Sequence, residues 1–524
     1  MKKIIVLYII VVSFSGFSQE HAWVYFKDKP NASSYLANPL SMLSQRALDR
    51  RARQNIGLNL QDVPISNQYI NQVNALNGVA VKAKSKWLNA IHVYGSEMDI
   101  RAAENLSFVD YIEFASNEIT NKSEKTKSFT ETTIDYNYGN SLNQNEQIKA
   151  TYLHQNDLTG KEIWIAVMDN GFGGVDTHAG FQKIRDNNQI LGSYNFVQRD
   201  NNLDTGGTHG MSVLSTIAGY VEDELIGTAP DAKFYLFVTE DVNSESPLEE
   251  SLWVEAAERA DSLGVDVINT SLGYRDFDEA KYNHTYADFN GHTTFIARGA
   301  SIVASKGMIA TIAAGNDGNG FHYISTPADA TDVLTVGAVD SNGNIASFSS
   351  YGPTADGRIK PDVDAKGKNT TIITSSGTVG TGSGTSFASP VMCGAVASLW
   401  QAFPNLTSYQ IMQFIRESAH LYQNPDDHYG YGIPNFENAY ARAIIEANAV
   451  STPKIYPNPT ADVIHFTRHV DEIYLVNVCG SILLHKEKTT SGLNRVNISN
   501  IVEGIYFLNL KMNKKNYTFK IIKN

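Results

Sequence analysis

The 524-residue sequence contains only two cysteines, Cys393 and Cys479, so a framework of disulfides is not what stabilises it. The two fall in segments that we assign to different domains, and we expect no disulfide between them. Basic residues are also in the minority, with 42 Lys and Arg against 55 Asp and Glu and a formal net charge of −13. Nucleic-acid binding needs a basic face, so we expect no nucleic-acid partner.

Long apolar runs are absent as well. The only strongly apolar stretch, residues 4–12, is too short to remain in a bilayer as an anchor. It follows Lys2 and Lys3 and leads into small residues, with Gly16 and Ser18 at the −3 and −1 positions of a cleavage site. This three-part pattern predicts a signal peptide over residues 1–18, and therefore export without a stable transmembrane anchor.

The remaining chain is long enough, and at 42% hydrophobic apolar enough, for several folded domains. Residues 19–117 alternate short strand and helix patterns in the order β-α-β-β-α-β, which predicts a small α+β (ferredoxin-like) domain. The expected strands are 22–26, 79–84, 88–94 and 109–114, and the helices are 69–76 and 96–105. A basic helical insertion, 45–54, carries four arginines, and we expect it to present a solvated face rather than a binding patch.

Residues 118–147 are polar and without sustained periodicity, which predicts a linker. From 148 to 449, near-continuous apolar runs alternate with helical patterns, as in a doubly wound parallel sheet. The expected strands are 162–168, 234–239, 265–269, 309–313 and 333–339, and the helices are 247–263, 294–306, 386–403 and 408–420. Residues 450–524 hold only short alternating runs between turns, which predicts an antiparallel β-sandwich.

Three segments of the central region carry residues suited to nucleophilic catalysis. Asp169 ends a predicted buried strand, His209 stands among glycines before an apolar helix, and Ser386 begins another helix. A serine at a helix start has backbone N–H groups and the positive end of the helix dipole beside it. Each segment alone is weak evidence, but the chain order Asp, His, Ser is one of the known arrangements of a catalytic triad.

A fourth segment supports the same interpretation. Asn316 follows the predicted strand 309–313, in the stretch Ala-Ala-Gly-Asn-Asp-Gly. A side-chain amide at that place can donate a hydrogen bond to a tetrahedral oxyanion, which is typically worth about 3–4 kcal/mol in the transition state.

With these four motifs the chain resembles the subtilase (subtilisin-like) family of serine peptidases, over about 300 residues and most specifically at Gly-Thr-Ser-Phe-Ala-Ser-Pro, residues 384–390. The resemblance implies Asp169 as the orienting acid, His209 as general base and acid, Ser386 as nucleophile and Asn316 as oxyanion donor. It further implies that two segments wall the substrate pocket, formed by Ser271, Leu272, Gly273, Ala313, Ala314 and Gly315. Asn170 and Met211 depart from the residues common in the family, but neither moves a proton in the mechanism.

The same resemblance explains the flanks. The N-terminal domain is similar to the inhibitory propeptide of subtilases, and the linker is where we expect it to be cut. The C-terminal segment opens with Tyr-Pro-Asn-Pro-Thr, residues 456–460, and resembles the sorting domain of type IX secretion cargo. We therefore expect five parts: signal peptide 1–18, propeptide 19–117, linker 118–147, peptidase domain 148–449 and sorting domain 450–524.

The expected function is a secreted serine endopeptidase made as a zymogen and located outside the cell or on the outer-membrane surface. Its partners would be protein or peptide substrates, its own propeptide and the type IX machinery. The alternatives are a peptide ligase or cyclase that uses the same triad, and a non-catalytic adhesion protein on a peptidase fold. The resemblance implies no cofactor for the chemistry and allows structural Ca²⁺, but no loop has the EF-hand spacing and no ligands are named. Asp317, beside the expected pocket, would favour basic substrate residues. The long insertion 274–294 is expected to be a surface excursion, with a part in shaping substrate access as the alternative.

Overall fold

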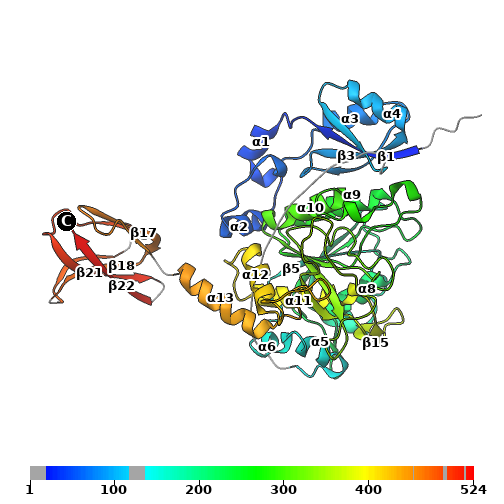
Figure 1. The fold of residues 1–524 in the computed structure, drawn as a ribbon. Helices are drawn as coiled ribbons and strands as arrows, with labels where there is room; N and C mark the ends of the chain where they lie inside the picture. The colour runs from blue at the N-terminus through cyan, green and yellow to red at the C-terminus, as the bar shows by residue number, and fades with distance from the viewer. Residues whose placement is uncertain (1–18, 117–135, 452–453, 479, 488–492, 513–514) are drawn as a thin grey trace, which may run out of the picture. The chain divides into compact units, whose positions relative to one another are not determined.

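The computed structural model describes residues 19–116, 136–451, 454–478, 480–487, 493–512 and 515–524 (Figure 1). They form two compact units, which divide between Ala443 and Ile444. The predicted signal peptide, the first part of the predicted linker and Cys479 lie outside the described residues, whereas Cys393 is buried and free. No helix in the described ranges has both the length and the apolar character that crossing a membrane requires.

The N-terminal domain is a four-stranded antiparallel sheet in the order β2-β3-β1-β4. Its apolar face packs against two helices around Val24, Val73, Ile91 and Ile100. The predicted β-α-β-β-α-β order is confirmed. The elements are β1 (Gln19–Phe26), α1 (Ala32–Ala37), α2 (Gln45–Arg53), α3 (Asn67–Asn74), β2 (Ala80–Ser85), β3 (Ala90–Ser96), α4 (Glu97–Arg101) and β4 (Val109–Phe114).

The central domain contains a seven-stranded parallel sheet, which confirms the predicted doubly wound α/β fold. Its strand order is β13-β12-β11-β10-β5-β9-β6. The central strands β10, β11 and β12 are buried along their whole length because both faces of the sheet are covered by helices. The strands are β5 (Trp164–Asp169), β6 (Ile190–Asn195), β9 (Lys233–Val238), β10 (Val267–Thr270), β11 (Ile309–Ala313), β12 (Leu334–Val339) and β13 (Val363–Lys366).

Helices α9 and α10 pack together on the side of the sheet that faces the N-terminal domain, while α8 and α11 pack on the other side (Figure 1). Helix α9 begins at Pro247, with a capping box between Ser246 and Glu249, and ends at Leu263. It is capped there by Gly264, whose φ of 95° few other residues adopt. The helices are α5 (Leu142–Glu146), α6 (Ala150–Gln155), α7 (Gln182–Asp186), α8 (His209–Ala218), α9 (Pro247–Leu263), α10 (Phe295–Val303), α11 (Thr385–Trp400), α12 (Ser408–Ser418) and α13 (Phe436–Ser451). Two small hairpins pair β7 (Tyr220–Val221) with β8 (Leu225–Ile226), and β14 (Thr370–Ile373) with β15 (Val379–Gly382).

The described end of the predicted linker, residues 136–147, is not a linker. It forms a short 3₁₀ turn and helix α5, with Ser141, Gln144 and Asn145 fully buried. Their polar side chains bond to backbone carbonyls of the peptidase domain, among them Thr371 and Ile226. Polar composition suggested a linker, but here polar side chains satisfy buried backbone groups.

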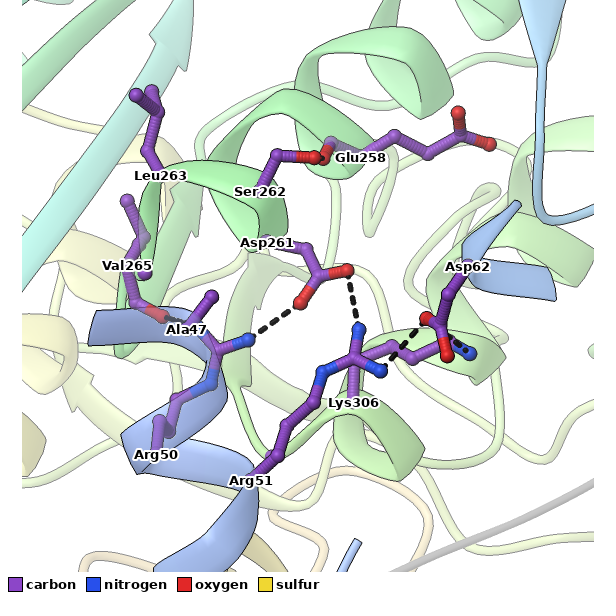
Figure 2. A network of polar contacts seen from close by, with 12 residues as sticks. Ala47, Arg50, Arg51, Asp62, Glu258, Asp261, Ser262, Leu263, Val265 and Lys306 are labelled. Atoms are coloured by element: carbon purple, nitrogen blue, oxygen red, sulfur yellow. Dashed lines mark hydrogen bonds and ion pairs between the residues drawn. The ribbon is translucent and has the colours of Figure 1, made fainter. Parts of the chain in front are cut away.

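The arginine-rich helix was also predicted wrongly. Helix α2 was expected to be solvated, yet Arg50 and Arg51 are each 1% exposed. Both guanidinium groups bond to Asp261 on α9, as Figure 2 shows. Buried acidic partners on a domain distant in sequence leave no local signal.

The insertion at 274–294 is likewise not a surface excursion. Its aromatic residues enter the core, with Tyr274, Tyr282 and Phe289 at most 2% exposed. The Tyr282 hydroxyl also accepts a hydrogen bond from the His21 backbone N–H of β1 at 3.2 Å. The insertion therefore joins the peptidase core to the N-terminal domain.

The C-terminal unit consists of two antiparallel sheets, β16-β17-β20 and β19-β18-β21-β22, as predicted. Its core includes Ile464, Leu475, Val496 and Leu508. Burial alternates along β21, as expected of strands with one face inside. The strands are β16 (Ile455–Tyr456), β17 (Val463–Val470), β18 (Glu472–Asn477), β19 (Ile482–Glu487), β20 (Leu493–Asn497), β21 (Gly504–Met512) and β22 (Lys515–Lys523).

Candidate active site

Asp169 and His209 meet at the carboxyl end of the parallel sheet. Asp169 is the last residue of β5 and is fully buried, while His209 is the first residue of α8. The His209 Nδ1 and Asp169 Oδ1 atoms are 2.8 Å apart, and Oδ1 also accepts the Asn170 N–H at 2.9 Å. This bond leaves Nε2 as the ring atom available to a nucleophile.

The charge of Asp169 raises the pKa of His209 above its usual value, against burial, which would lower it. The same hydrogen bond contributes to the rise. A buried carboxylate thus fixes the orientation of the ring and makes it a stronger base.

Ser386 is the second residue of α11, so its side chain lies at the amino end of that helix. Its hydroxyl donates to the Ser271 carbonyl at 3.2 Å, and the Ser271 hydroxyl donates to the Ser386 carbonyl at 2.8 Å. Within the described residues no hydrogen bond joins Ser386 to His209, although the ring of neighbouring Phe387 is centred 5.8 Å from the imidazole. Such bonds are often completed only when substrate binds.

A buried polar network holds the start of α11 against β10. The Asn269 side chain donates to the Ser271 hydroxyl at 3.0 Å and accepts from the Ser389 hydroxyl at 3.1 Å. All three side chains are at most 4% exposed. The position of the Ser386 backbone is therefore set by the core rather than by a surface loop.

Asn316 lies across from Ser386 with its amide group oriented by α11. Its Oδ1 accepts from the Thr385 N–H at 2.9 Å and from the Thr385 hydroxyl at 3.1 Å. Both partners donate, so the carbonyl side of the amide faces the helix. The Nδ2 group makes no hydrogen bond within the described chain and remains available as a donor.

A cleft of about 350 Å³ opens beside these groups. Ser386 and Asn316 both line this cleft. So do five of the six pocket residues expected from the sequence, namely Ser271, Leu272, Gly273, Ala313 and Gly315. The exception, Ala314, is fully buried because its N–H donates to the Val336 carbonyl and continues the sheet. Gly315, at φ 110°, leaves no room for a side chain, since a Cβ there would lie 2.9 Å from the Ser350 hydroxyl.

Charged residues that the sequence analysis did not assign also line this cleft. Arg275 and Asp276 come from the start of the insertion, and Glu245 comes from the loop before α9. Arg275 pairs with Asp276 and lies 3.6 Å from Asp317, so the acid expected to favour basic substrates has a partner. The length of the insertion was the only sequence signal for Arg275 and Asp276, and Glu245 had none.

A second cleft of about 420 Å³ shares Leu272 and Glu245 with the first and is rich in carboxyl groups. Glu240, Glu245 and Glu249 lie close enough to hold one cation. Burial raises the pKa of Glu240 to about 8 and that of Glu249 to about 10. Burial thus disfavours the ionised form of both carboxyl groups while no cation is bound.

Comparison with known proteins agrees with this geometry. The model of the subtilase family matches residues 160–432, more than half of the chain. Two further models match the flanks: a peptidase S8 propeptide domain of Bacteroidota over 21–131, and a secretion system C-terminal sorting domain over 454–524. The chain is thus a propeptide-bearing type IX cargo, which indicates a location outside the cell or on its surface.

Individual relatives match to different extents. The chain is 30% identical to subtilisin NAT of Bacillus subtilis subsp. natto over 299 residues, 56% of this chain and 69% of that protein. It is 26% identical to an alkaline protease of Alkalihalobacillus alcalophilus over 411 residues, 76% of this chain and 94% of the relative. Subtilisin-like protease SBT6.1 of Arabidopsis thaliana is 34% identical over 49% of this chain, a match that spans only 23% of that longer protein. With its parallel sheet, its buried acid–histidine pair and these matches, the chain belongs to the subtilase family of serine peptidases.

Proposed function

We propose that this chain is a secreted serine endopeptidase that cleaves peptide bonds in proteins through Asp169, His209 and Ser386, and that it is made as a zymogen. The observation that carries the proposal is the buried Asp169–His209 bond at 2.8 Å, at the same end of the sheet as Ser386 and its cleft. Relatives named as proteases support the reaction class.

In the proposed mechanism His209 removes the proton of the Ser386 hydroxyl as the oxygen attacks the substrate carbonyl. The imidazolium that forms is stabilised by the charge of Asp169, which also fixes its tautomer. His209 then gives this proton to the leaving amine, which leaves an ester on Ser386. Water enters with His209 again as base and releases the acyl group.

Negative charge develops on the carbonyl oxygen during both steps. The free Nδ2 of Asn316 and the backbone N–H of Ser386 at the start of α11 are the donors we assign to it. Their placement by the core favours the transition state without reorganisation. The backbone at 271–273, which lines the cleft, is suited to pair with an extended peptide, as an added strand would.

The contacts of the N-terminal domain support the zymogen assignment. Its sheet lies on α9 and α10 of the peptidase domain (Figure 1), with Trp23 stacked on Phe295 at 4.7 Å. The Trp23 indole N–H donates to the Ser251 hydroxyl at 2.7 Å. Both carboxylate oxygens of Glu113 accept from Arg298 at 2.8 Å.

The proposal is tested by the hydrolysis of an unfolded protein such as denatured casein, followed by the release of new amino termini. Ser386→Ala should lower the rate on the order of 10⁶-fold, because the nucleophile is lost. Ser383→Ala, which alters an exposed serine three residues earlier, serves as the matched control and should retain activity.

Hydrolysis by Ser386→Ala at the wild-type rate would overturn the assignment. Products joined by new peptide bonds, in place of new amino termini, would identify a ligase instead. A processed wild-type protein that is inactive would favour the adhesion alternative.

A further inference from the structure

Helix α2 of the propeptide buries two neighbouring arginines against the peptidase domain. Arg50 and Arg51 extend from one end of this helix toward α9, and Figure 2 shows both directed at the same carboxylate. Arg50 bonds to Asp261 Oδ1 at 2.5 Å, and Arg51 bonds to Oδ2 at 2.6 Å. One fully buried acid of the peptidase therefore serves two arginines of the propeptide.

Each arginine also bonds to a second partner, so the network continues beyond Asp261 on both sides. Arg51 also bonds at 2.7 Å to Asp62 of the propeptide, and Lys306 of the peptidase lies 3.3 Å from that same carboxylate (Figure 2). Arg50 donates in addition to the Val265 carbonyl. The five charged residues of the chain Arg50–Asp261–Arg51–Asp62–Lys306 thus alternate in sign, with three from the propeptide and two, Asp261 and Lys306, from the peptidase domain.

Because the network is buried, its stability depends strongly on every one of its charged side chains. Burial alone would raise the pKa of Asp261, but Arg50 and Arg51 lower it below its usual value. If the propeptide leaves, Asp261 loses both partners at once and water must replace them. Removing one partner of a buried pair is costly for this reason, whereas exposed pairs contribute little.

The network is separate from the cleft beside Ser386. None of the residues that line that cleft takes part in it. The segment between the two domains, 117–135, also lies outside it, so a cut there leaves every one of these contacts in place. Contacts within one chain then become contacts between two.

We propose that α2 is a second anchor, which keeps the propeptide bound to the peptidase domain after the linker is cut, and that the surface around Asp261 is a receptor for a helix with adjacent arginines. The partner that this surface fits is the propeptide itself. The proposal rests on the zymogen part of the proposed function but not on its catalysis, so it can fail while the assignment of Ser386 holds.

The test uses the full chain with Ser386→Ala, which prevents self-cleavage, and a recognition sequence for a foreign protease introduced between 118 and 135. After cleavage, the protein is immobilised through its C-terminus and the loss of the propeptide is followed over time. Replacing both Arg50 and Arg51 by Met should speed that loss on the order of 100-fold or more.

Arg53→Met is the matched control. It removes one positive charge from the same helix, where the test variant removes two, but Arg53 is exposed and its side chain donates to the Pro404 carbonyl at 3.1 Å. We expect this variant to lose the cleaved propeptide at most about threefold faster than wild type, since contacts of exposed charged side chains are weak. Asp261→Asn should accelerate loss in wild type but change little in the Arg50→Met, Arg51→Met background, because the three residues act as one unit.

Each variant is checked for cooperative thermal unfolding before cleavage. If the Met variant does not fold, Arg50→Lys with Arg51→Lys replaces it, since lysine keeps the charge but not the forked geometry. Loss as slow as in wild type would overturn the proposal, as would equal acceleration by Arg53→Met, which would reduce the effect to net charge.

Discussion

The orientation of one side chain, Asn316, is decided by its neighbour. Thr385 presents two donors to it, at 2.9 and 3.1 Å, and these fix the oxygen toward α11 and the Nδ2 group toward the cleft. An asparagine held in this way differs from an ordinary turn residue, because its amide is aimed before substrate arrives. The sequence supplied the residue and its place after a strand but could not supply this orientation.

Asn316→Ala should lower kcat roughly 10²–10³-fold, because a donor to the developing oxyanion is removed. KM should change little, since that donor acts mainly in the transition state. Asn319→Ala, in the same loop and exposed, is the control. Steady-state kinetics on a peptide substrate provide the measurement, and unchanged turnover in Asn316→Ala would remove the oxyanion assignment.

A second prediction at this scale concerns the pH dependence of activity. Only neutral His209 can accept the Ser386 proton, so kcat/KM should fall as pH drops through its raised pKa. Asp169→Asn removes the charge that raises this pKa, so the acid limb should move to lower pH while the plateau falls roughly 10⁴-fold. Asp176→Asn, at an exposed site in the following loop, should leave the profile unchanged. If the acid limb of Asp169→Asn stayed at the wild-type pH, the charge of Asp169 would not control the pKa of His209, and the prediction would be contradicted.

At the scale of elements, β3 meets α9 through His92, which is paired with His21 of β1. His92, 1% exposed, lies 2.7 Å from the Ser251 hydroxyl of α9, and its other nitrogen is 2.8 Å from Nδ1 of His21. Burial lowers the pKa of His21 from 6.5 to about 4, and it lowers the pKa of His92 as well. Lys281 and Lys82 act in the same direction on His21, and Glu20 opposes them.

Release of the cleaved propeptide should therefore depend on pH. A histidine whose pKa is lowered in the bound state favours binding fully above its free value, and this contribution is lost as pH falls. For His21, the contribution to binding is lost between about pH 6.5 and about pH 4. In the cut Ser386→Ala chain, dissociation of the propeptide should accelerate as the pH falls through this window. Gel filtration measures the dissociation.

His92→Gln should flatten this dependence, whereas His428→Gln, at an exposed position of the peptidase, should keep it. Equal pH dependence in wild type and His92→Gln would show that other groups control release.

Elements with a strong local pattern were predictable from the sequence. The buried strands β5 and β11 are nearly continuous apolar runs, and α9 carries both a capping box and a terminal glycine. The edge strands β6 and β13 were missed, because Ile-Leu-Gly-Ser-Tyr-Asn and Val-Asp-Ala-Lys have no long apolar run and depend on a neighbouring strand. The burial of α2 was missed for a related reason, since its partner Asp261 lies about two hundred positions further along the chain.

For the whole molecule, the order of parts follows the path of an exported zymogen. A propeptide domain rests on the peptidase, and a separate C-terminal unit with its own core matches a secretion sorting domain. The sequence predicted this organisation because each part has its own periodicity and motifs. It could not predict how the propeptide is held, which depends on pairs of residues brought together only by the fold.

The measurement that tests the central claim most directly is labelling with a fluorophosphonate, before and after the propeptide is lost, with the modified residue identified by mass spectrometry. We predict that labelling appears with loss of the propeptide, is confined to Ser386 and is absent in Ser386→Ala. A folded, fully processed protein that takes no label, or takes it at another serine, would contradict the assignment of Ser386 as the nucleophile.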